Sequence, residues 1–281
     1  MSEAESMSSK EGVREDDCQH TFRGLGPARF VSLRLTRSTA IDLIDLPPQE
    51  VAGRLAALLQ APPAESGPVT LAFLNMRYFV ASRRDPDAVQ AFAAMDQVYP
   101  DGVGLQIARR LLGLRRYPRV SGTDTVPMLL ERLTPLTRVY LLGGTPAISA
   151  AAQAGIARLF PRVTIVGSHH GFFQEAQDDS VVAAIAATAP DLLLVGMGCP
   201  LQERWLARNR HRLPARLAIC VGGLFHYWAD DLRRAPRSMR DIGLEWLWIL
   251  VQQPYKWRVF SIDAAYFGAA LMRLKRPRSS S

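Results

Sequence analysis

Short runs of consecutive apolar residues recur along the chain and are separated by segments of helical length. The apolar runs lie at 69–74, 138–142, 163–166, 191–195 and 217–221. Each run is apolar almost throughout, which is typical of parallel strands that are covered on both faces. The helix-length segments lie at 86–95, 103–113, 124–133, 147–159, 178–188 and 201–211. This alternation predicts an α/β fold with a doubly wound parallel sheet.

Residues 1–26 differ from this pattern. They carry six acidic and three basic residues, are rich in Ser and contain no long apolar run. Segments of this composition bury too little apolar surface to fold, so we expect a disordered leader. The same residues lack the apolar region of a secretory signal.

The pattern changes again after Pro236, where the chain becomes rich in Trp and helical in spacing. Apolar and aromatic residues are interleaved with Lys and Arg over 242–274, and a basic tail follows. This is typical of an amphipathic helix in the interface of an anionic membrane, although an ordinary core or dimer-forming helix is the alternative. We therefore divide the chain into the leader 1–26, a core at 27–238, and a C-terminal appendage with its basic tail at 239–281.

The composition is that of a globular protein, since 48 % of the 281 residues are hydrophobic and 21 % are charged. No run of about 18 uncharged apolar residues is present, so no transmembrane helix is predicted. The three cysteines, Cys18, Cys199 and Cys220, form no CxxC pair. We therefore expect neither a disulfide scaffold nor a zinc site of ordinary spacing. The small number of cysteines also leads us to expect a cytoplasmic location.

The net charge is +8, and residues 254–281 carry six basic residues against one acidic residue. A basic excess suits nucleic acid, anionic lipid or a phosphate-bearing substrate. No RNP, helix-turn-helix or zinc-finger pattern accompanies the basic residues, which argues against nucleic acid.

Glycines follow three of the predicted strands. They are Gly143 and Gly144, Gly196 and Gly198, and Gly222 and Gly223. Ligands of parallel α/β sheets bind beyond the carboxyl ends of the strands, and bare backbone N–H groups at helix N-termini hold phosphate well. The loops therefore predict a phosphate-bearing ligand, with tight turns that need a positive φ as the alternative.

Asp101 follows a strand-like apolar stretch and precedes a predicted helix. A carboxylate in this place is well positioned to act as a general base, although it could simply cap the helix at 103–113. Asp124 and Glu203 lie in the first turns of other helices, where a negative charge suits the helix dipole whatever its function.

Two sequence features resemble metal-binding patterns, but neither is expected to bind a metal. Asp85-Pro86-Asp87 is formally a D-x-D motif, but Pro86 at the first helical position makes Asp85 an N-cap. His169, His170 and His226 have no Cys or carboxylate partner at ligand spacing. The sequence therefore predicts no metal site.

Several motifs occur in a fixed order between residues 40 and 260. They are PDGVG at 100–104, VSGTD at 120–124, LGGTP at 142–146, GFF at 171–173, GMGCPLQE at 196–203, VGGLF at 221–225, RAP at 234–236 and GLEWL at 243–247. As an ordered set they resemble the WecG/TagA/CpsF glycosyltransferase family.

The resemblance implies an inverting, metal-independent transferase that moves a sugar from a UDP-sugar to an undecaprenyl-diphosphate-linked saccharide. It implies a Rossmann-like core and an appendage that docks on the membrane and completes the active site. The enzyme would be cytoplasmic and peripheral on the inner face of the cell membrane, with no cofactor. Its partners would be the UDP-sugar, the lipid-linked acceptor, the anionic membrane surface and, in a homo-oligomer, further copies of itself.

The resemblance also assigns roles to residues. Asp101 matches the family's catalytic carboxylate, which would deprotonate the acceptor hydroxyl. The diphosphate or acceptor would be bound by Arg234, Lys256 and Arg258. The donor would be bound by Asn75, Gly102, Gly104, Thr123, Asp124, Gly143, Gly144, Gly196, Gly198, Gln202, Glu203, Gly222, Gly223 and His226.

The chain departs from the family pattern where donor and acceptor would be recognised. Phe73 stands in place of a Thr, Met76-Arg77 in place of a small-plus-acidic pair, His226 in place of an Asp and Ile249 in place of an Arg. We therefore favour transfer of a hexose, glucose above all, in exopolysaccharide biosynthesis of the xanthan type. The alternatives are an N-acetylmannosamine or N-acetylmannosaminuronate transferase of the same family, and a non-catalytic, membrane-associated subunit that binds sugar nucleotides.

Overall fold

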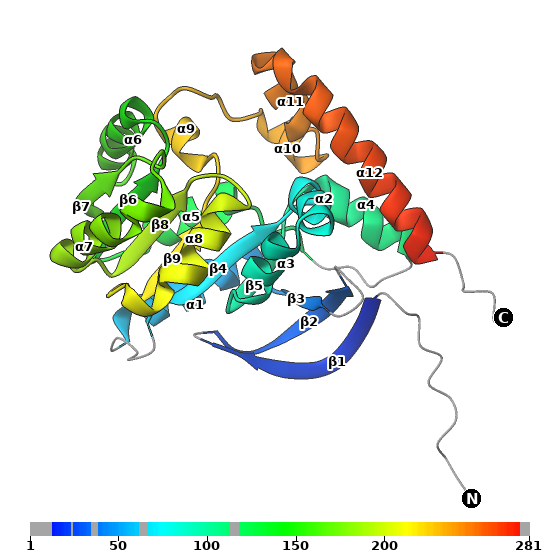
Figure 1. Cartoon of the computed structure of the whole chain (residues 1–281), viewed down its shortest axis with the longest axis horizontal. Coiled ribbons are helices and arrows are strands. Elements are labelled where there is room, and N and C mark those ends of the chain that lie inside the picture. The colour runs from blue at the N-terminus through cyan, green and yellow to red at the C-terminus, as the bar shows by residue number, and fades with distance from the viewer. Residues whose placement is uncertain (1–12, 24, 35–38, 62–66, 113–117, 276–281) are drawn as a thin grey trace, which may run out of the picture.

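A sheet of nine strands crosses the molecule in the order β1-β2-β3-β5-β4-β9-β8-β6-β7 (Figure 1). The computed structural model describes residues 13–23, 25–34, 39–61, 67–112 and 118–275. The strands are β1 Val13–Phe22, β2 Gly26–Arg34, β3 Ala40–Ile44, β4 Val69–Leu74, β5 Gln97–Pro100, β6 Arg138–Gly143, β7 Thr164–His169, β8 Leu192–Gly196 and β9 Leu217–Cys220. All pairs from β3 to β7 are parallel, so the predicted α/β class is confirmed.

The first three strands form an antiparallel extension of the sheet. β1 pairs with β2, and β2 with β3, both antiparallel. The prediction of a disordered leader over 1–26 is therefore wrong for residues 13–22, and residues 1–12 lie outside the described residues. The end of β1 is fixed by packing, because Phe22 and Phe30 are buried and meet edge to face with ring centroids 5.9 Å apart.

Helices cover both faces of the sheet, as a doubly wound fold requires. α1 Pro48–Gln60, α5 Gly122–Leu130, α6 Pro146–Leu159 and α9 Leu224–Trp228 share one core cluster. The opposite cluster contains α2 Met76–Arg84, α3 Pro86–Ala93, α4 Gly102–Leu112, α7 Asp178–Thr188 and α8 Leu201–Asn209. Along β4, Leu71 and Phe73 enter the first cluster while Ala72 and Leu74 enter the second, because successive strand residues point to opposite faces. All six residues of β4 are buried.

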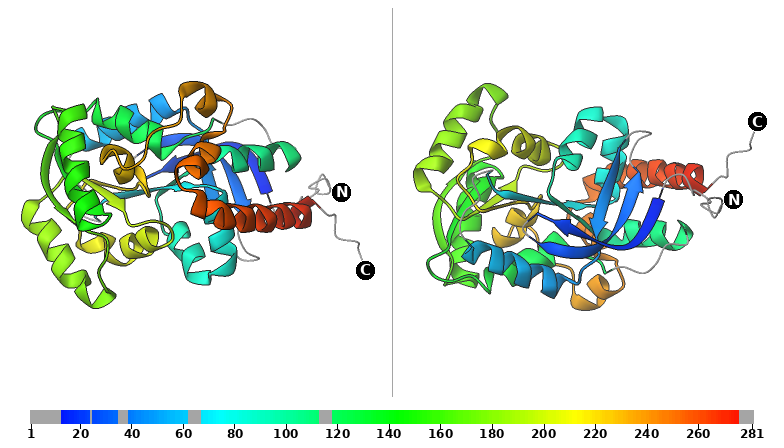
Figure 2. Two further views of the ribbon diagram at one scale, coloured as in Figure 1. Left: turned by 90° about the horizontal axis from the view of Figure 1, so that it is seen from above. Right: turned by 90° about the horizontal axis from the view of Figure 1, so that it is seen from below.

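The C-terminal segment is helical and lies against the core. It consists of α10 Arg237–Asp241, α11 Glu245–Gln252, the short 3-10 helix η3 Pro254–Lys256 and α12 Trp257–Lys275. The core contains two other 3-10 helices, η1 Glu175–Gln177 and η2 Arg210–Arg212. α12 crosses beside α2 and α4 (Figure 2), and Phe267 meets Phe79 of α2 edge to face with ring centroids 5.3 Å apart. In the part of the chain that is described, no helix is long and apolar enough to cross a bilayer.

Candidate active site

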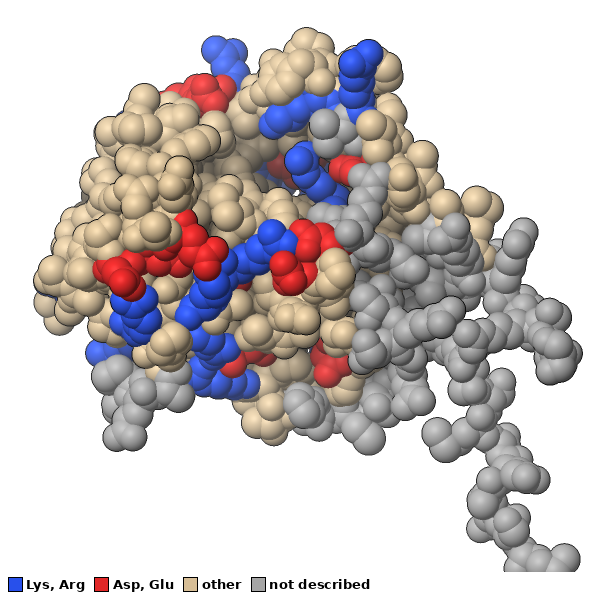
Figure 3. Space-filling view, viewed as in Figure 1, with Lys and Arg blue, Asp and Glu red and all other residues tan. Residues whose placement is uncertain are grey.

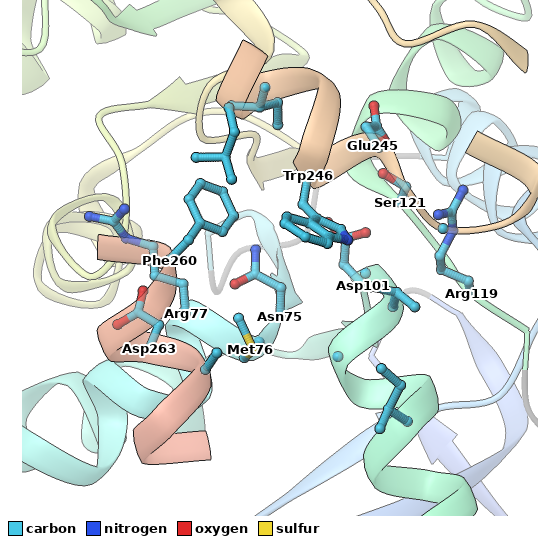
Figure 4. A pocket seen from close by; sticks show the side chains of 18 of the residues that line it. Asn75, Met76, Arg77, Asp101, Arg119, Ser121, Glu245, Trp246, Phe260 and Asp263 are labelled. Atoms are coloured by element: carbon cyan, nitrogen blue, oxygen red, sulfur yellow. The ribbon is translucent and has the colours of Figure 1, made fainter. Parts of the chain in front are cut away.

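A cavity of about 630 Å³ lies between the carboxyl ends of β4 and β5 and the C-terminal helices α11 and α12 (Figure 4). Its floor comes from the core, through Asn75, Asp101, Gly102, Gly104, Arg119, Ser121 and Thr123. Its roof comes from the C-terminal segment, through Glu245, Trp246, Ile249, Leu250, Trp257 and Phe260. Trp246 and Phe260 contact each other with ring centroids 6.4 Å apart. The core thus contributes most of the polar side chains of the lining, beside the apolar Met76, Val103 and Ile107, while the C-terminal segment contributes mainly apolar ones.

Asn75 and Asp101 are brought together by the pairing of β4 with β5. Each follows the last residue of its strand, and the Asp101 N–H donates to the Leu74 carbonyl at 2.8 Å. Asn75 is the N-cap of α2, because its Oδ1 accepts from the Tyr78 N–H at 3.1 Å. Both predicted site residues thus lie at the carboxyl edge of the parallel sheet, where ligands of such folds bind.

Gly102 and Gly104 allow the chain to turn from β5 into α4 beside Asp101. Gly102 has a φ of +79°, and a Cβ on Gly104 would lie 2.8 Å from Cβ of Met76. Both glycines line the cavity, but the turn and the close approach of α2 are sufficient reasons for them.

Asp101 has the electrostatic character of a base that works near neutral pH. Burial raises the pKa of its carboxyl to about 7, and the negative charge of Glu245 adds to that rise. The charge of Arg119 and hydrogen bonds from the Ser121 hydroxyl and the Gly102 N–H act in the opposite direction and limit it. The group can therefore both accept and release a proton within the physiological range.

Asp124 joins the C-terminal segment to the core. Its carboxylate lies 2.8 Å from the Arg234 guanidinium, 2.9 Å from that of Arg240 and 3.8 Å from that of Arg119. Arg234 also donates to the Thr123 carbonyl and lies 3.4 Å from Glu245. Asp124 and Arg234 thus contact each other, while their predicted roles in binding donor and diphosphate stay predictions.

A second set of bonds fixes α11. The Trp248 Nε1–H and the Gln252 amide both donate to the Arg233 carbonyl at 3.0 Å, and the Arg233 N–H donates to Gln252 Oε1 at 2.8 Å. Together with the contacts of Asp124, these bonds hold the roof of the cavity above Asp101.

The glycine loops after β6, β8 and β9 lie along the same sheet edge, outside the lining of this cavity. Gly143 has a φ of +146°, and a Cβ there would lie 2.4 Å from the Gly196 carbonyl, so packing of β6 against β8 accounts for it. A Cβ on Gly198 or Gly223 would meet nothing within 4 Å. These two loops therefore leave open space at the end of the sheet, and their predicted contact with the donor stays a prediction.

Gln202 and Glu203 lie below those loops and are almost completely buried, at 1 % and 0 % exposure. The Gln202 amide donates to Glu203 Oε1 at 2.7 Å, and its Oε1 accepts from the Gly222 N–H at 3.0 Å. Burial raises the pKa of Glu203 to about 7. Since Glu203 has no exposed surface, it would affect a ligand only through its neighbours, which include Gln202 and the thiols of Cys199 and Cys220.

Three predicted residues remain, namely His226, Lys256 and Arg258. His226 Nδ1 is 2.7 Å from the Asp231 carboxylate, and the Arg258 guanidinium lies over the Trp257 ring, 5.9 Å from its centroid. The pKa of Lys256 is lowered by burial and by the charge of Arg77, while the charge of Asp231 opposes this. His226, Lys256 and Arg258 all lie outside the set of described residues that line the cavity.

The D-x-D motif has the structural role that its sequence suggests. Asp85 is the N-cap of α3, because its carboxylate accepts from the Asp87 N–H at 3.1 Å, and it also pairs with Arg204. Across the described ranges, no group of three or more His, Cys, Asp or Glu side chains is placed to hold a metal ion. Independence from metal stays a prediction.

The family model for the glycosyl transferase WecG/TagA/CpsF family matches residues 38–281 of the chain. The chain belongs to this glycosyltransferase family. The resemblance of its ordered motifs is thereby confirmed.

Two relatives of this glycosyltransferase are named N-acetylglucosaminyldiphosphoundecaprenol N-acetyl-beta-D-mannosaminyltransferase. The protein of Bacillus spizizenii strain W23 is 29 % identical over 199 residues, which cover 70 % of this chain and 76 % of the relative. That of Bacillus subtilis strain 168 is 29 % identical over 187 residues, which cover 66 % and 72 %. These names favour the N-acetylmannosamine alternative over the glucose donor that we preferred from the sequence.

Several residues of the glycosyltransferase cavity were missed by sequence reasoning. Arg119 and Ser121 flank Val120, at the start of the VSGTD motif, and Glu245 and Trp246 belong to the GLEWL motif. These motifs identify the family, but nothing in their spacing places them around Asp101. In the sequence, Arg77 is only a departure from the family pattern, whereas in the structure it lines the cavity.

Proposed function

We propose that this glycosyltransferase moves N-acetylmannosamine from its UDP derivative to N-acetylglucosamine carried on undecaprenyl diphosphate. The observation that supports the reaction is the position of Asp101, a carboxylate with a pKa of about 7 on the floor of a cavity with a largely apolar roof. The choice of donor and acceptor is supported by the names of the two relatives.

In the proposed reaction Asp101 accepts the proton of the acceptor hydroxyl. The electron pair that the O–H bond leaves on the acceptor oxygen forms a bond to the anomeric carbon of the donor. The bond from that carbon to the UDP oxygen breaks. UDP leaves with the electron pair. Because attack comes from the face opposite the leaving group, the configuration at the anomeric carbon is inverted, and no metal ion takes part.

The proposal places the enzyme on the cytoplasmic face of the membrane. The acceptor's polyprenyl chain is anchored there, while its sugar must reach Asp101 beneath α11 and α12. Exposed apolar side chains on these helices support the placement, among them Val251 at 69 %, Trp257 at 57 % and Tyr266 at 53 % exposure.

The test is a competition among UDP-sugars with a short-chain prenyl-diphosphate N-acetylglucosamine acceptor, read by product mass. We expect UDP-N-acetylmannosamine to be consumed and the acceptor to gain one N-acetylhexosamine. Preferred consumption of UDP-glucose would overturn the choice of donor and restore the exopolysaccharide interpretation. Binding of UDP without transfer from any donor would instead indicate a non-catalytic subunit.

A further inference from the structure

Glu245 is a second carboxylate in the cavity, and the proposed reaction does not use it. It is the first residue of α11 and lines the cavity together with Asp101. Figure 4 shows it on the side of the cavity that also carries Asp101 and Ser121, across from Phe260. The C-terminal segment therefore brings an acidic side chain to the site of the base, in addition to its apolar ones.

The contacts of Glu245 within the protein leave its carboxylate able to accept hydrogen bonds. Its Oε1 lies 3.4 Å from Nε of Arg234, but neither atom has a hydrogen-bond partner in the described part of the chain. The Arg234 guanidinium donates instead to the Thr123 carbonyl and to the Asp124 carboxylate. Because 17 % of the Glu245 side chain stays exposed and the residue lines the cavity, a bound ligand can contact it.

Attachment of α11 to the core does not depend on Glu245 alone. Trp248 and Gln252 of the same helix both donate to the Arg233 carbonyl at 3.0 Å. A negative charge suits the first turn of a helix, but this charge lies in the same cavity as Asp101 and helps to raise the pKa of that carboxyl. Two carboxylates in one cavity oppose each other's ionisation, and this arrangement is typical of functional sites.

The residue after Glu245 adds an aromatic surface to the site. Trp246 is 40 % exposed, lines the cavity and contacts Phe260. A sugar ring carries hydroxyls around its edge and C–H groups on its faces. Ligand sites combine aromatic walls with a few polar groups that fix the orientation of the ligand, and an ionised carboxylate accepts strong hydrogen bonds from hydroxyls. Glu245 and Trp246 therefore match the two kinds of surface that a sugar presents.

We propose that Glu245 binds the acceptor sugar through a hydroxyl other than the one that Asp101 deprotonates. The inference rests on the proposed function, in which the acceptor sugar lies against Asp101. The carboxylate of the core accepts the proton, while the carboxylate of α11 fixes the orientation of the sugar ring. Glu245 thereby determines which hydroxyl of the acceptor is presented to the base, and so the specificity of transfer.

The test combines variants of Glu245 with acceptors that each lack one hydroxyl. For Glu245→Gln and Glu245→Ala, kcat/KM is measured with prenyl-diphosphate N-acetylglucosamine and with its monodeoxy analogues. The affinities for the same acceptors are measured by calorimetry in the Asp101→Asn background, without a donor. Glu175→Ala is the matched control, because Glu175 is also the first residue of a helix and lies 3.5 Å from Nε of Arg208, with 74 % of its side chain exposed.

Loss of a hydrogen bond to a charged group should lower acceptor kcat/KM and affinity about tenfold or more in Glu245→Ala. Removal of the hydroxyl that Glu245 binds should cost the wild type a similar factor and Glu245→Ala little, because the contact is already lost. Glu245→Gln keeps an accepting oxygen and should retain part of the affinity. Since the charge of Glu245 raises the pKa of Asp101, this variant should also move the pH transition of kcat/KM to lower pH.

Equal losses from each missing hydroxyl in the wild type and in Glu245→Ala would overturn the proposal, because a purely structural role would weaken all acceptors by the same factor. A rise in donor KM with an unchanged acceptor KM would also overturn it. The calorimetry uses no donor, so an error in the proposed donor would not affect the result. If the wild type bound a different prenyl-diphosphate saccharide, the proposed acceptor would be wrong, and the monodeoxy analogues of that saccharide would decide the role of Glu245.

Discussion

Two carboxylates of this protein share an elevated pKa but have different surroundings. Burial raises the pKa of both Asp101 and Glu203 to about 7. Asp101 lines the cavity, whereas Glu203 has no exposed surface and contacts Gln202. A perturbed pKa therefore does not by itself identify the base, and access to the cavity decides between the two residues.

The pH dependence of transfer should follow Asp101. A general base must be ionised, so kcat/KM should rise as pH increases through about 7 and then level off. Asp101→Asn should lower transfer by about 10²- to 10⁴-fold and abolish the transition, as measured by initial rates between about pH 5.5 and 9. Glu203→Gln, which keeps an acceptor for the Gln202 amide, should retain the transition, and its disappearance in that variant would assign it to Glu203.

The same pKa has a consequence for stability. Because the folded-state pKa of Asp101 lies above its ordinary value of 3.8, the carboxyl stabilises the fold at low pH, and this contribution is lost as pH rises through about 7. In the Asp101→Asn variant the side chain does not ionise, so the variant does not lose this stability as pH rises. Its melting temperature should therefore exceed that of the wild type above about pH 7.5, a trade of stability for activity that is common in active sites.

At the scale of elements, the apolar pattern predicts most of the parallel strands and misses the antiparallel strand β1. The run at 69–74 coincides with β4, and the runs that begin at 138, 191 and 217 largely overlap β6, β8 and β9. β1 was missed because its sequence, VREDDCQHTF, is mostly polar. β1 is a strand because it pairs with β2, and the composition of β1 alone does not predict that pairing.

The candidate site shows the same limit. Asp101 can be predicted because it follows an apolar stretch and precedes glycines that open the backbone. Glu245 and Trp246 join the site only when the C-terminal helices fold over the core, through the contacts of Asp124 with Arg234 and Arg240. These contacts join residues that are 110 and 116 positions apart in the sequence. Neither the hydrophobic periodicity nor the spacing of the motifs predicts contacts over such separations.

The contacts of Asp124 should control the placement of α10 and α11. Asp124→Ala leaves Arg234 and Arg240 without their carboxylate, so we expect faster amide exchange over 237–252 and at least about a tenfold loss of transfer. Exchange is measured by mass spectrometry on the native protein. Asp230→Ala is the control, because Asp230 pairs with Arg158 at 2.7 Å with both side chains more than half exposed, and such pairs contribute little. Equal protection in both variants would refute the role of Asp124.

Across the whole molecule, many charges of the core are internally balanced. Arg204 pairs with Asp85, Arg208 with Asp178, and Arg212 with Asp179. Figure 3 shows basic and acidic side chains next to each other on the face that it draws. The excess positive charge is therefore not gathered there as a nucleic-acid surface would need. The partners to test are the phosphate-bearing substrates and an anionic membrane.

Membrane attachment should depend on the exposed apolar side chains of the C-terminal helices. Trp257 and Tyr266 are 57 % and 53 % exposed on α12, and burial of each large side chain is worth about 1.5–3 kcal/mol. Trp257→Ser with Tyr266→Ser should therefore weaken co-sedimentation with anionic vesicles at least about tenfold. Leu136→Ser removes a side chain that is 86 % exposed on the core and should have no effect. Equal losses in both proteins would show that attachment is not specific to α12.

The aromatic pair of the roof, Trp246 and Phe260, also affects whether the sugar of the donor is transferred to the acceptor or lost to water. A carboxylate that can activate a sugar hydroxyl can equally activate water, and water would hydrolyse the donor to free sugar and UDP. The faces of indole and phenyl rings above Asp101 are poor hydrogen-bond partners for water. They would keep water away from Asp101, so that Asp101 activates the hydroxyl of the bound acceptor. Hydrolysis of the sugar nucleotide in the absence of acceptor would then be slow.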